Sequence, residues 1–278
     1  MEYEIELKLL TNKDAGELIK STLLPLLNAN VTQQKLVLSN HYFDTPQRTL
    51  RQHDIGLRIR GNQQRFEQTL KTAGLSIGGL HQRSEYNAEL HAFEQQNTMM
   101  PNLQLFPKSA WPKAINVEAI QQTLETLFTT HFERCVYLLE FPNTDVVELV
   151  FDLGEITCGE KSVPICEIEL ELKKGSVSTI FSCAKQIVSL LSTSIGTASK
   201  AARGYQLLDD SPPRSLAKYT PAVLAETPLS KPEFVALLNA LLQSFQTLSA
   251  DVAEFYTQDL GNDILFVLSD LTTNVARF

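Results

Sequence analysis

Charged and apolar side chains alternate at the very start of this chain. In residues 2–9, Glu4, Glu6 and Lys8 fall on one face, while aromatic and aliphatic residues fall on the other. Successive side chains of a β-strand point to opposite sides, so a period of two predicts a strand with one charged and one apolar face. We therefore expect the first strand of the fold at the N-terminus.

The same alternation returns further along the chain, in segments separated by turn-forming residues. The other predicted strands are 35–43, 56–60, 65–71, 83–90, 132–141, 146–152 and 165–172. Apolar residues at helical spacing predict helices over 13–28, 117–129, 176–191 and 200–208. About eight strands with mostly short connections favour an α+β fold, an antiparallel barrel or sandwich with helices packed outside.

A proline-containing stretch with little periodicity follows these elements. It includes Pro212, Pro213, Pro221 and Pro228, and such composition is typical of segments between domains. We predict a barrel domain over 1–207, a linker over 208–230 and a short helical segment over 231–278, with two helices between residues 231 and 276.

Composition narrows the class of protein. The 278 residues are 43% hydrophobic and 20% charged, which is typical of a globular protein. The net charge of -8 argues against a nucleic-acid partner. We find no apolar run of the roughly 20 residues that span a bilayer, no secretory signal and no Cys-x-x-Cys pair. We therefore expect a cytoplasmic protein with neither a nucleic-acid nor a membrane partner.

The amphipathic helices change the expected direction of the charged strand faces. For a single strand, the simplest interpretation is that the charged face is solvated. Here many strands carry such a face, and the helices need apolar sheet surface to cover. If the helices pack outside, the charged faces line the interior of the barrel. Buried charges are costly unless they are paired, bound to a metal or bound to a ligand, so the interior is a candidate polar site.

The residue types in that interior indicate a ligand class. Glu4 with Glu6, and Glu167 with Glu169, are alternating carboxylate pairs, and such hard oxygen donors suit Mg²⁺ or Mn²⁺. Arginine and lysine side chains bind phosphate oxygens. Acids for a metal together with bases for an anion are typical of polyphosphate chemistry. We find no P-loop and no recognisable serine–histidine–aspartate arrangement.

These residues together resemble a known family. Glu4-Ile5-Glu6-Leu7-Lys8 is similar to the ExExK motif of CYTH proteins, the triphosphate tunnel metalloenzymes. Further matching segments follow in the family's order over residues 1–207: 56–60 (GLRIR), 68–71 (QTLK), 78–87 (GGLHQRSEYN), 164–171 (PICEIELE) and 199–205 (SKAARGY). The strongest resemblance is to bacterial inorganic triphosphatases in which a CHAD helical domain follows the CYTH domain.

The resemblance implies an eight-stranded antiparallel closed β-barrel, a tunnel open at both ends, and a role for many of its charged residues. It implies Mg²⁺ or Mn²⁺ on Glu4, Glu6, Glu167 and Glu169. Glu4, Glu6, Lys8 and Glu169 would be catalytic. The expected triphosphate-binding residues are Lys8, Arg58, Arg60, Lys71, Arg83, Arg134, Lys200 and Arg203. Glu85 and Asp152 match acidic tunnel positions with a metal or structural role, and Glu171 either faces the tunnel with its neighbours or lies at its rim. Val136 stands where the family usually has a second basic residue on the sixth strand.

The implied activity is hydrolysis of inorganic triphosphate, a small-molecule substrate, to pyrophosphate and phosphate. Class IV adenylyl cyclases share the family, and thiamine or nucleoside triphosphate hydrolysis is another alternative. A polyphosphate-binding module without activity would keep the basic residues but would not need both carboxylate pairs, so the intact pairs favour an enzyme. By the same resemblance, residues 231–278 are interpreted as the start of a truncated CHAD domain.

Overall fold

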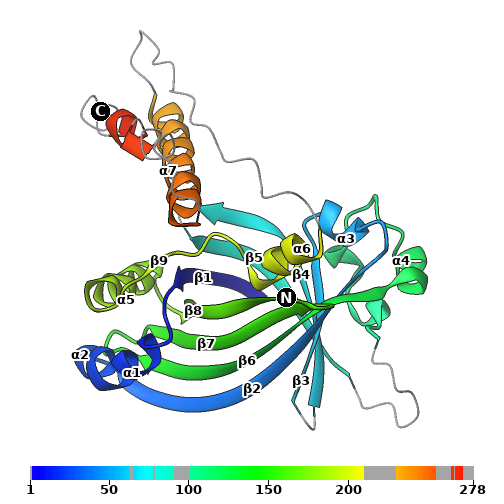
Figure 1. Ribbon diagram of the computed structural model, residues 1–278, viewed down its shortest axis with the longest axis horizontal. Helices are drawn as coiled ribbons and strands as arrows, with labels where there is room; N and C mark the ends of the chain where they lie inside the picture. Colours follow the sequence, from blue (N-terminus) through cyan, green and yellow to red (C-terminus); the bar gives the residue numbers. More distant parts are fainter. Residues whose placement is uncertain are drawn as a thin grey trace. The chain divides into compact units, whose positions relative to one another are not determined.

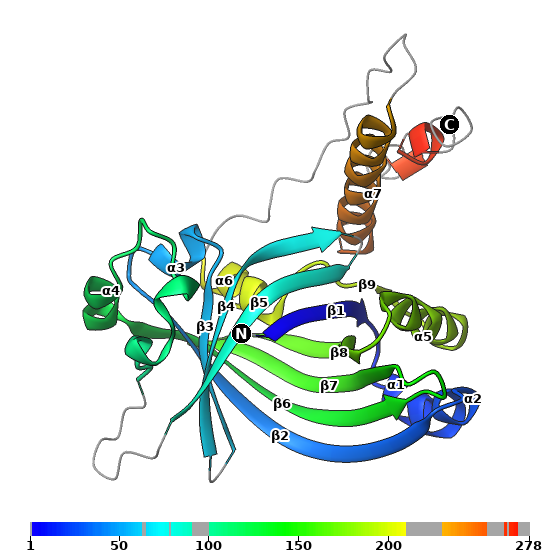
Figure 2. The same cartoon turned by 180° about the vertical axis from the view of Figure 1, so that it is seen from behind.

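The fold is built around a ring of antiparallel strands (Figures 1 and 2). The computed structural model describes residues 2–62, 65–77, 79–90, 100–209, 230–254, 264–265 and 267–271. The ring strands are β1 (Glu2–Leu10), β2 (Asn30–Asp44), β3 (Gly56–Asn62), β4 (Arg65–Ile77), β5 (Leu80–Leu90), β6 (Glu125–Glu140), β7 (Val146–Cys158) and β8 (Lys161–Lys174). Their order is β5-β4-β3-β2-β6-β7-β8-β1, and β1 also pairs with β5. The predicted antiparallel fold with a ring of eight strands is thus confirmed.

Helices cover the outer, apolar face of this ring. One group consists of α1 (Ala15–Leu18), the π-helical η1 (Ile19–Leu23), α2 (Leu24–Leu26) and α5 (Val177–Leu190). Another consists of α3 (Thr49–Gln52), α4 (Val117–Thr123) and the 3₁₀ turns η2 (Leu103–Leu105) and η3 (Lys108–Ala110). The two groups lie at opposite ends of the sheet (Figure 2). The remaining elements are β9 (Ser194–Ile195), which pairs with the end of β1, and α6 (Lys200–Leu208).

The core therefore lies between the sheet and the helices, not inside the ring. Ile19 and Ile187 pack against Leu7 and Leu170 in one cluster of fully or nearly fully buried residues. Each of these strand residues alternates with a charged neighbour that must point the other way. This confirms the expectation that helices outside the sheet turn the charged faces inward.

Some element boundaries differ from those predicted. The predicted helix over 117–129 is wrong in its second half, because α4 ends at Thr123 and β6 begins at Glu125. In this part of β6, Phe128 stacks on Tyr42 of β2 at a centroid distance of 4.7 Å. Pairing with β2 therefore overrides the apolar spacing that favoured a helix.

The chain divides into two compact units, Met1–Asp210 and Ser211–Phe278. The second unit contains α7 (Lys231–Glu254) and a short helical stretch at 267–271. Most of the predicted linker 208–230, and part of the two helices predicted up to residue 276, lie outside the described residues. Among the residues described, no helix is long and apolar enough to cross a membrane.

A charged tunnel as candidate active site

The ring of strands encloses a cavity of about 540 Å³. All eight ring strands contribute side chains to its wall, and the first turn of α6 contributes Ser199, Lys200 and Ala201. The charged residues that line it are Glu4, Glu6, Lys8, Arg58, Arg60, Glu67, Lys71, Arg83, Glu85, Arg134, Glu148, Glu169, Glu171, Lys173 and Lys200. Acids and bases are thus closely mixed on one surface.

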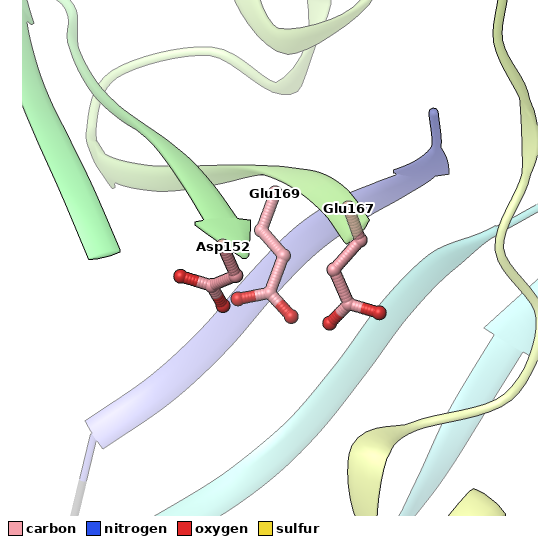
Figure 3. A group of neighbouring side chains, drawn as sticks. All are labelled: Asp152, Glu167 and Glu169. Carbon is pink, nitrogen blue, oxygen red and sulfur yellow. The ribbon is translucent and has the colours of Figure 1, made fainter. Parts of the chain in front are cut away.

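Three buried carboxylates meet at one place in this interior (Figure 3). Asp152 on β7 lies directly across from Glu167 on β8, and Glu169 is the next residue of β8 on the same face. Carboxylate oxygens of the three residues lie within 4.8 Å of one another. Their side chains point toward a shared space in Figure 3. This spacing and these oxygen donors fit a hard divalent metal ion.

Three cations surround this carboxylate cluster. Arg134 donates two hydrogen bonds of 2.7 Å to the two oxygens of Asp152 and one of 2.9 Å to Glu169. Lys200 Nζ lies 2.6 Å from Asp152 Oδ2 and 3.1 Å from Glu169 Oε1, and it also contacts Glu167. Lys8 contacts Glu169 and lies 3.1 Å from Glu167 Oε1.

The cations lower the pKa values of two carboxylates of the cluster despite their burial. Burial alone would raise the pKa of Glu169, but Lys200, Lys8 and Arg134 together hold that pKa well below its ordinary value. The pKa of Asp152 is lowered in the same way by Lys200 and Arg134. Burial would likewise lower the pKa of Lys200, and the three carboxylates raise it instead. Asp152 and Glu169 are therefore available as charged oxygen donors at neutral pH.

A second network joins β1 with β4 and β5. Lys71 Nζ lies 2.6 Å from Glu4 Oε1 and 2.8 Å from Glu85 Oε2. Arg83 is 3.2 Å from both Glu4 and Glu6, and the register places Arg83 directly across from Glu4. These side chains form a mixed wall of acids and bases along β1.

Two guanidinium groups differ from the other basic residues. Among the residues that the structure describes, Arg58 and Arg60 have no carboxylate within ion-pair distance. Arg58 Nε is buried without a hydrogen-bond partner, while Arg60 Nε donates to Asn40 Oδ1 at 3.0 Å. Burial, with the neighbouring Arg58 and Arg134, lowers the pKa of Arg60. An anion bound here would relieve both the missing hydrogen bond and the charge repulsion.

Lys200 reaches the cluster from α6. The helix begins after Ser199, whose side chain accepts a hydrogen bond from Ala202 N at 3.1 Å, an N-cap that fits the Ser-Lys start of the motif. One turn later, Arg203 Nη1 lies 3.5 Å from Glu167 Oε2, and its other nitrogen contacts Pro164 O. Lys200 and Arg203 lie three residues apart in the helix and both contact Glu167, so they face the same way.

The structure places the predicted site residues in two groups. Most of them line the cavity, including Glu4, Glu6 and Glu171. Asp152, Glu167 and Arg203 are not part of the lining and connect to it through Lys200, because Lys200 contacts both acids and shares α6 with Arg203. Of the four predicted metal ligands, Glu167 and Glu169 meet Asp152, whereas Glu4 and Glu6 pair with Lys71 and Arg83.

Sequence reasoning missed several polar residues of the site. Asn40 and Tyr42 lie on the same face of β2, and Tyr42 lines the cavity. Lys173 lies 2.8 Å from Glu171 and 3.5 Å from Glu148. The alternation of Asn40 with Tyr42 inside a predicted strand was a usable signal, whereas Lys173 follows the recognised motif and had none.

Comparison with known proteins identifies the family of this chain. The model of the CYTH domain family matches residues 2–205. Over 276 residues the chain is 35% identical to the inorganic triphosphatase of Haemophilus influenzae, a match that covers 95% of this chain and 72% of that protein. The chain belongs to the CYTH domain family.

One solved structure with a TM-score above 0.5 shows the same architecture. A protein from Hippeastrum, named as a candidate adenylyl cyclase with a dominant triphosphatase activity, has a TM-score of 0.51 and 17% identity. That match covers 73% of this chain and 95% of the other. A candidate adenylate cyclase from Bacillus halodurans has a TM-score of 0.40 and 21% identity, over 72% of this chain and 96% of the other. At its identity, the Hippeastrum protein supports the fold alone.

Proposed function

We propose that this protein hydrolyses inorganic triphosphate to pyrophosphate and phosphate inside the tunnel. One observation carries the proposal: guanidinium groups without acidic partners face the cavity, and so does Glu169, which belongs to a carboxylate cluster suited to a metal. A metal-chelating polyanion satisfies both sets at once. The 35% identity to an inorganic triphosphatase supports triphosphate as that polyanion.

The carboxylates fit a divalent cation, which we propose is Mg²⁺ or Mn²⁺. Glu167 and Glu169 are shared by the predicted ligand set and by the observed cluster, and Asp152 is the third carboxylate of that cluster. Glu4 and Glu6 remain proposed ligands from β1, the strand that pairs with β8. When bound, the metal neutralises charge on the phosphates and lowers the pKa of water. The chain's own part is to hold Asp152 and Glu169 ionised.

The basic residues would bind and orient the phosphates. Arg58 and Arg60 offer donors that no carboxylate occupies, so we assign them the first contacts with the anion. Lys8, Arg134 and Lys200 contact acids in the absence of substrate and can exchange these for phosphate oxygens. Lys71, Arg83 and Arg203 complete the proposed binding set. Donors that are fixed around the transferred phosphoryl group stabilise its charge as the bond to the leaving pyrophosphate breaks.

The decisive test is a comparison of substrates. The protein is incubated with inorganic triphosphate, ATP or thiamine triphosphate, each with Mg²⁺ and with Mn²⁺, and phosphate and cyclic AMP are measured. We expect phosphate release to be fastest from inorganic triphosphate and to require metal. Cyclic AMP release from ATP without phosphate release from triphosphate would establish a cyclase instead. Binding of triphosphate without turnover would indicate a polyphosphate-binding module.

We further propose that residues 1–207 form the complete tunnel domain, that 208–230 is a linker and that 231–278 begins a CHAD domain. The family match ends at residue 205 and the compact first unit ends at Asp210, which supports this division. A protein ending at Asp210 should retain the thermal midpoint and triphosphate turnover of the full chain. Loss of the folded tunnel on this truncation would contradict the division.

A further inference from the structure

Asp44, the last residue of β2, is a fully buried carboxylate outside the metal cluster. Its Oδ1 accepts hydrogen bonds from the backbone N–H groups of Thr45 at 2.7 Å and Leu50 at 2.8 Å. Its Oδ2 accepts from the backbone N–H of Arg51 at 3.0 Å and from the Tyr205 hydroxyl at 2.8 Å. A single side chain thus joins the end of β2 to α3 and to α6.

Tyr205 is held by more than this hydrogen bond. Its ring packs edge-to-face on Phe128 with centroids 5.3 Å apart, and the Arg51 guanidinium lies 4.7 Å over the ring centroid. Arg51 also pairs with Asp209 at 2.6 Å, just after the end of α6. We call Asp44, Arg51, Phe128 and Tyr205 the α6 clamp.

The clamp holds the helix that carries Lys200. Lys200 precedes Tyr205 by five residues in α6, about 7.5 Å along the helix axis. Lys200 is 6% exposed, and its ammonium group contacts Asp152, Glu167 and Glu169. A lysine on a flexible stem reaches a buried site reproducibly only when its backbone is fixed, because each ordered rotamer costs entropy.

We propose that Asp44 and Tyr205 are positioning residues, which hold α6 so that Lys200 is aimed at the tunnel carboxylates and at a bound triphosphate. Neither residue lines the cavity, so they act through the helix. This inference rests on the proposed function, since it assigns Lys200 to the triphosphate.

The test is removal of the Tyr205 hydroxyl. In Tyr205→Phe the ring packing on Phe128 and under Arg51 is kept, and only the hydrogen bond to Asp44 is lost. We expect KM for triphosphate to rise by about fivefold, the effect of one typical hydrogen bond, with a smaller change in kcat. The matched control is Tyr137→Phe. The Tyr137 hydroxyl is buried without a hydrogen-bond partner, in the core cluster that contains Ile19 and Ile187. That variant should keep the wild-type KM.

A double-mutant cycle separates positioning from general stabilisation. If Tyr205 acts through Lys200, Tyr205→Phe should change KM by less than about twofold when Lys200→Met is already present. Equal fold-changes with and without Lys200, or an unchanged KM in Tyr205→Phe alone, would overturn the proposal. A lower thermal midpoint by itself does not support it.

The same double-mutant cycle can be measured without turnover. Calorimetry gives the Kd of inorganic triphosphate, in the absence of metal, for wild type and for each variant of the cycle. The expected weakening of Kd in Tyr205→Phe should again vanish in the Lys200→Met background. If wild type binds triphosphate but does not hydrolyse it, the proposed function fails while the cycle still tests the clamp. If wild type turns over triphosphate and the cycle is additive, only the clamp proposal fails.

Discussion

Of the three carboxylates in the cluster, Glu169 is the one that also lines the cavity. It pairs with Lys8, Arg134 and Lys200, belongs to the carboxylate cluster and also lines the cavity. Replacing Glu169 with glutamine keeps its shape but removes the charge that a metal requires. We expect metal-dependent turnover of triphosphate to fall roughly a hundredfold or more, measured as initial rates over a titration of Mg²⁺ and Mn²⁺.

The matched control is Glu133→Gln. Glu133 lies on β6 with a half-exposed side chain and pairs with Lys35, away from the cavity. This variant should keep wild-type rates, because an exposed ion pair contributes little and no ligand contact is lost. Near wild-type activity in Glu169→Gln would remove this residue from the site.

Arg60 differs from Glu169 because, among the described residues, it has no oppositely charged partner within ion-pair distance. Arg60→Met should raise KM for triphosphate by about tenfold, because a charge-assisted hydrogen bond is lost. The same change should raise the thermal midpoint, because it removes a half-buried cation repelled by Arg58 and Arg134. Steady-state kinetics and thermal unfolding measure the two effects, with the exposed Lys35→Met as control. A lower midpoint would show that Arg60 stabilises the fold.

Side-chain direction could be predicted from the sequence at many of these positions, but partners could not. Alternation alone indicated that Glu167, Glu169 and Arg60 share a face with other charges. The contact between Asp152 and Lys200 depends on the register of β7 with β8 and on the placement of α6. A period of two leaves strand register open, so Glu4 and Glu6 could be paired with Glu167 and Glu169 only through the family resemblance.

At the scale of elements, α6 depends on one close approach to β6. A Cβ at Gly204 would lie 2.1 Å from Phe128 Cε2, a ring that also packs on Tyr42 and Tyr205. Gly204→Ala should therefore push α6 away, lower the free energy of unfolding by about 1–3 kcal/mol and reduce kcat/KM. Denaturant unfolding and kinetics measure these effects. Gln206→Ala, at an exposed position of the same helix, should change neither, and unchanged kinetics in Gly204→Ala would contradict the role of α6.

Elements whose ends are marked in the local sequence were predicted best. Elements whose extent is decided by pairing with another strand were predicted worst. The helix α6 was predicted with its observed bounds, because Ser199 caps it. Residues 74–77 look like a glycine-containing loop, yet they extend β4, because they pair with β5 through a register shift after Lys71. Local composition carries no information about such a partner strand.

At the scale of the whole molecule, a ring with a charged interior can be stable because the acids and bases inside it nearly balance. Apolar residues outside bury against helices, while acids and bases inside neutralise one another until a ligand replaces some of these contacts. Such a charged interior makes the stability of the tunnel depend on pH, because its carboxylates must stay ionised to pair. The direction follows from the pKa of each acid in the folded chain.

The pKa of Glu85 defines the pH range over which its contribution to stability changes. Burial alone would raise the pKa of its carboxyl, but Lys71 and Arg58 outweigh burial and lower the pKa to about 2, from 4.5. The unfolded chain then binds more protons than the folded chain between these values. The stabilisation from Glu85 is therefore present above pH 4.5 and is lost as the pH falls toward about 2. Asp152 and Glu169, whose pKa values are also lowered, act in the same direction.

We expect the free energy of unfolding to decrease steeply as the pH falls below 4.5, followed by circular dichroism in denaturant titrations at each pH. Glu85→Gln should be less stable than wild type at neutral pH, and the difference between the two should shrink as the pH falls, because wild-type Glu85 becomes neutral as well. A difference that stays constant across this range would show that Glu85 contributes through packing. The pairing of charges inside the ring would then not be the source of the pH dependence.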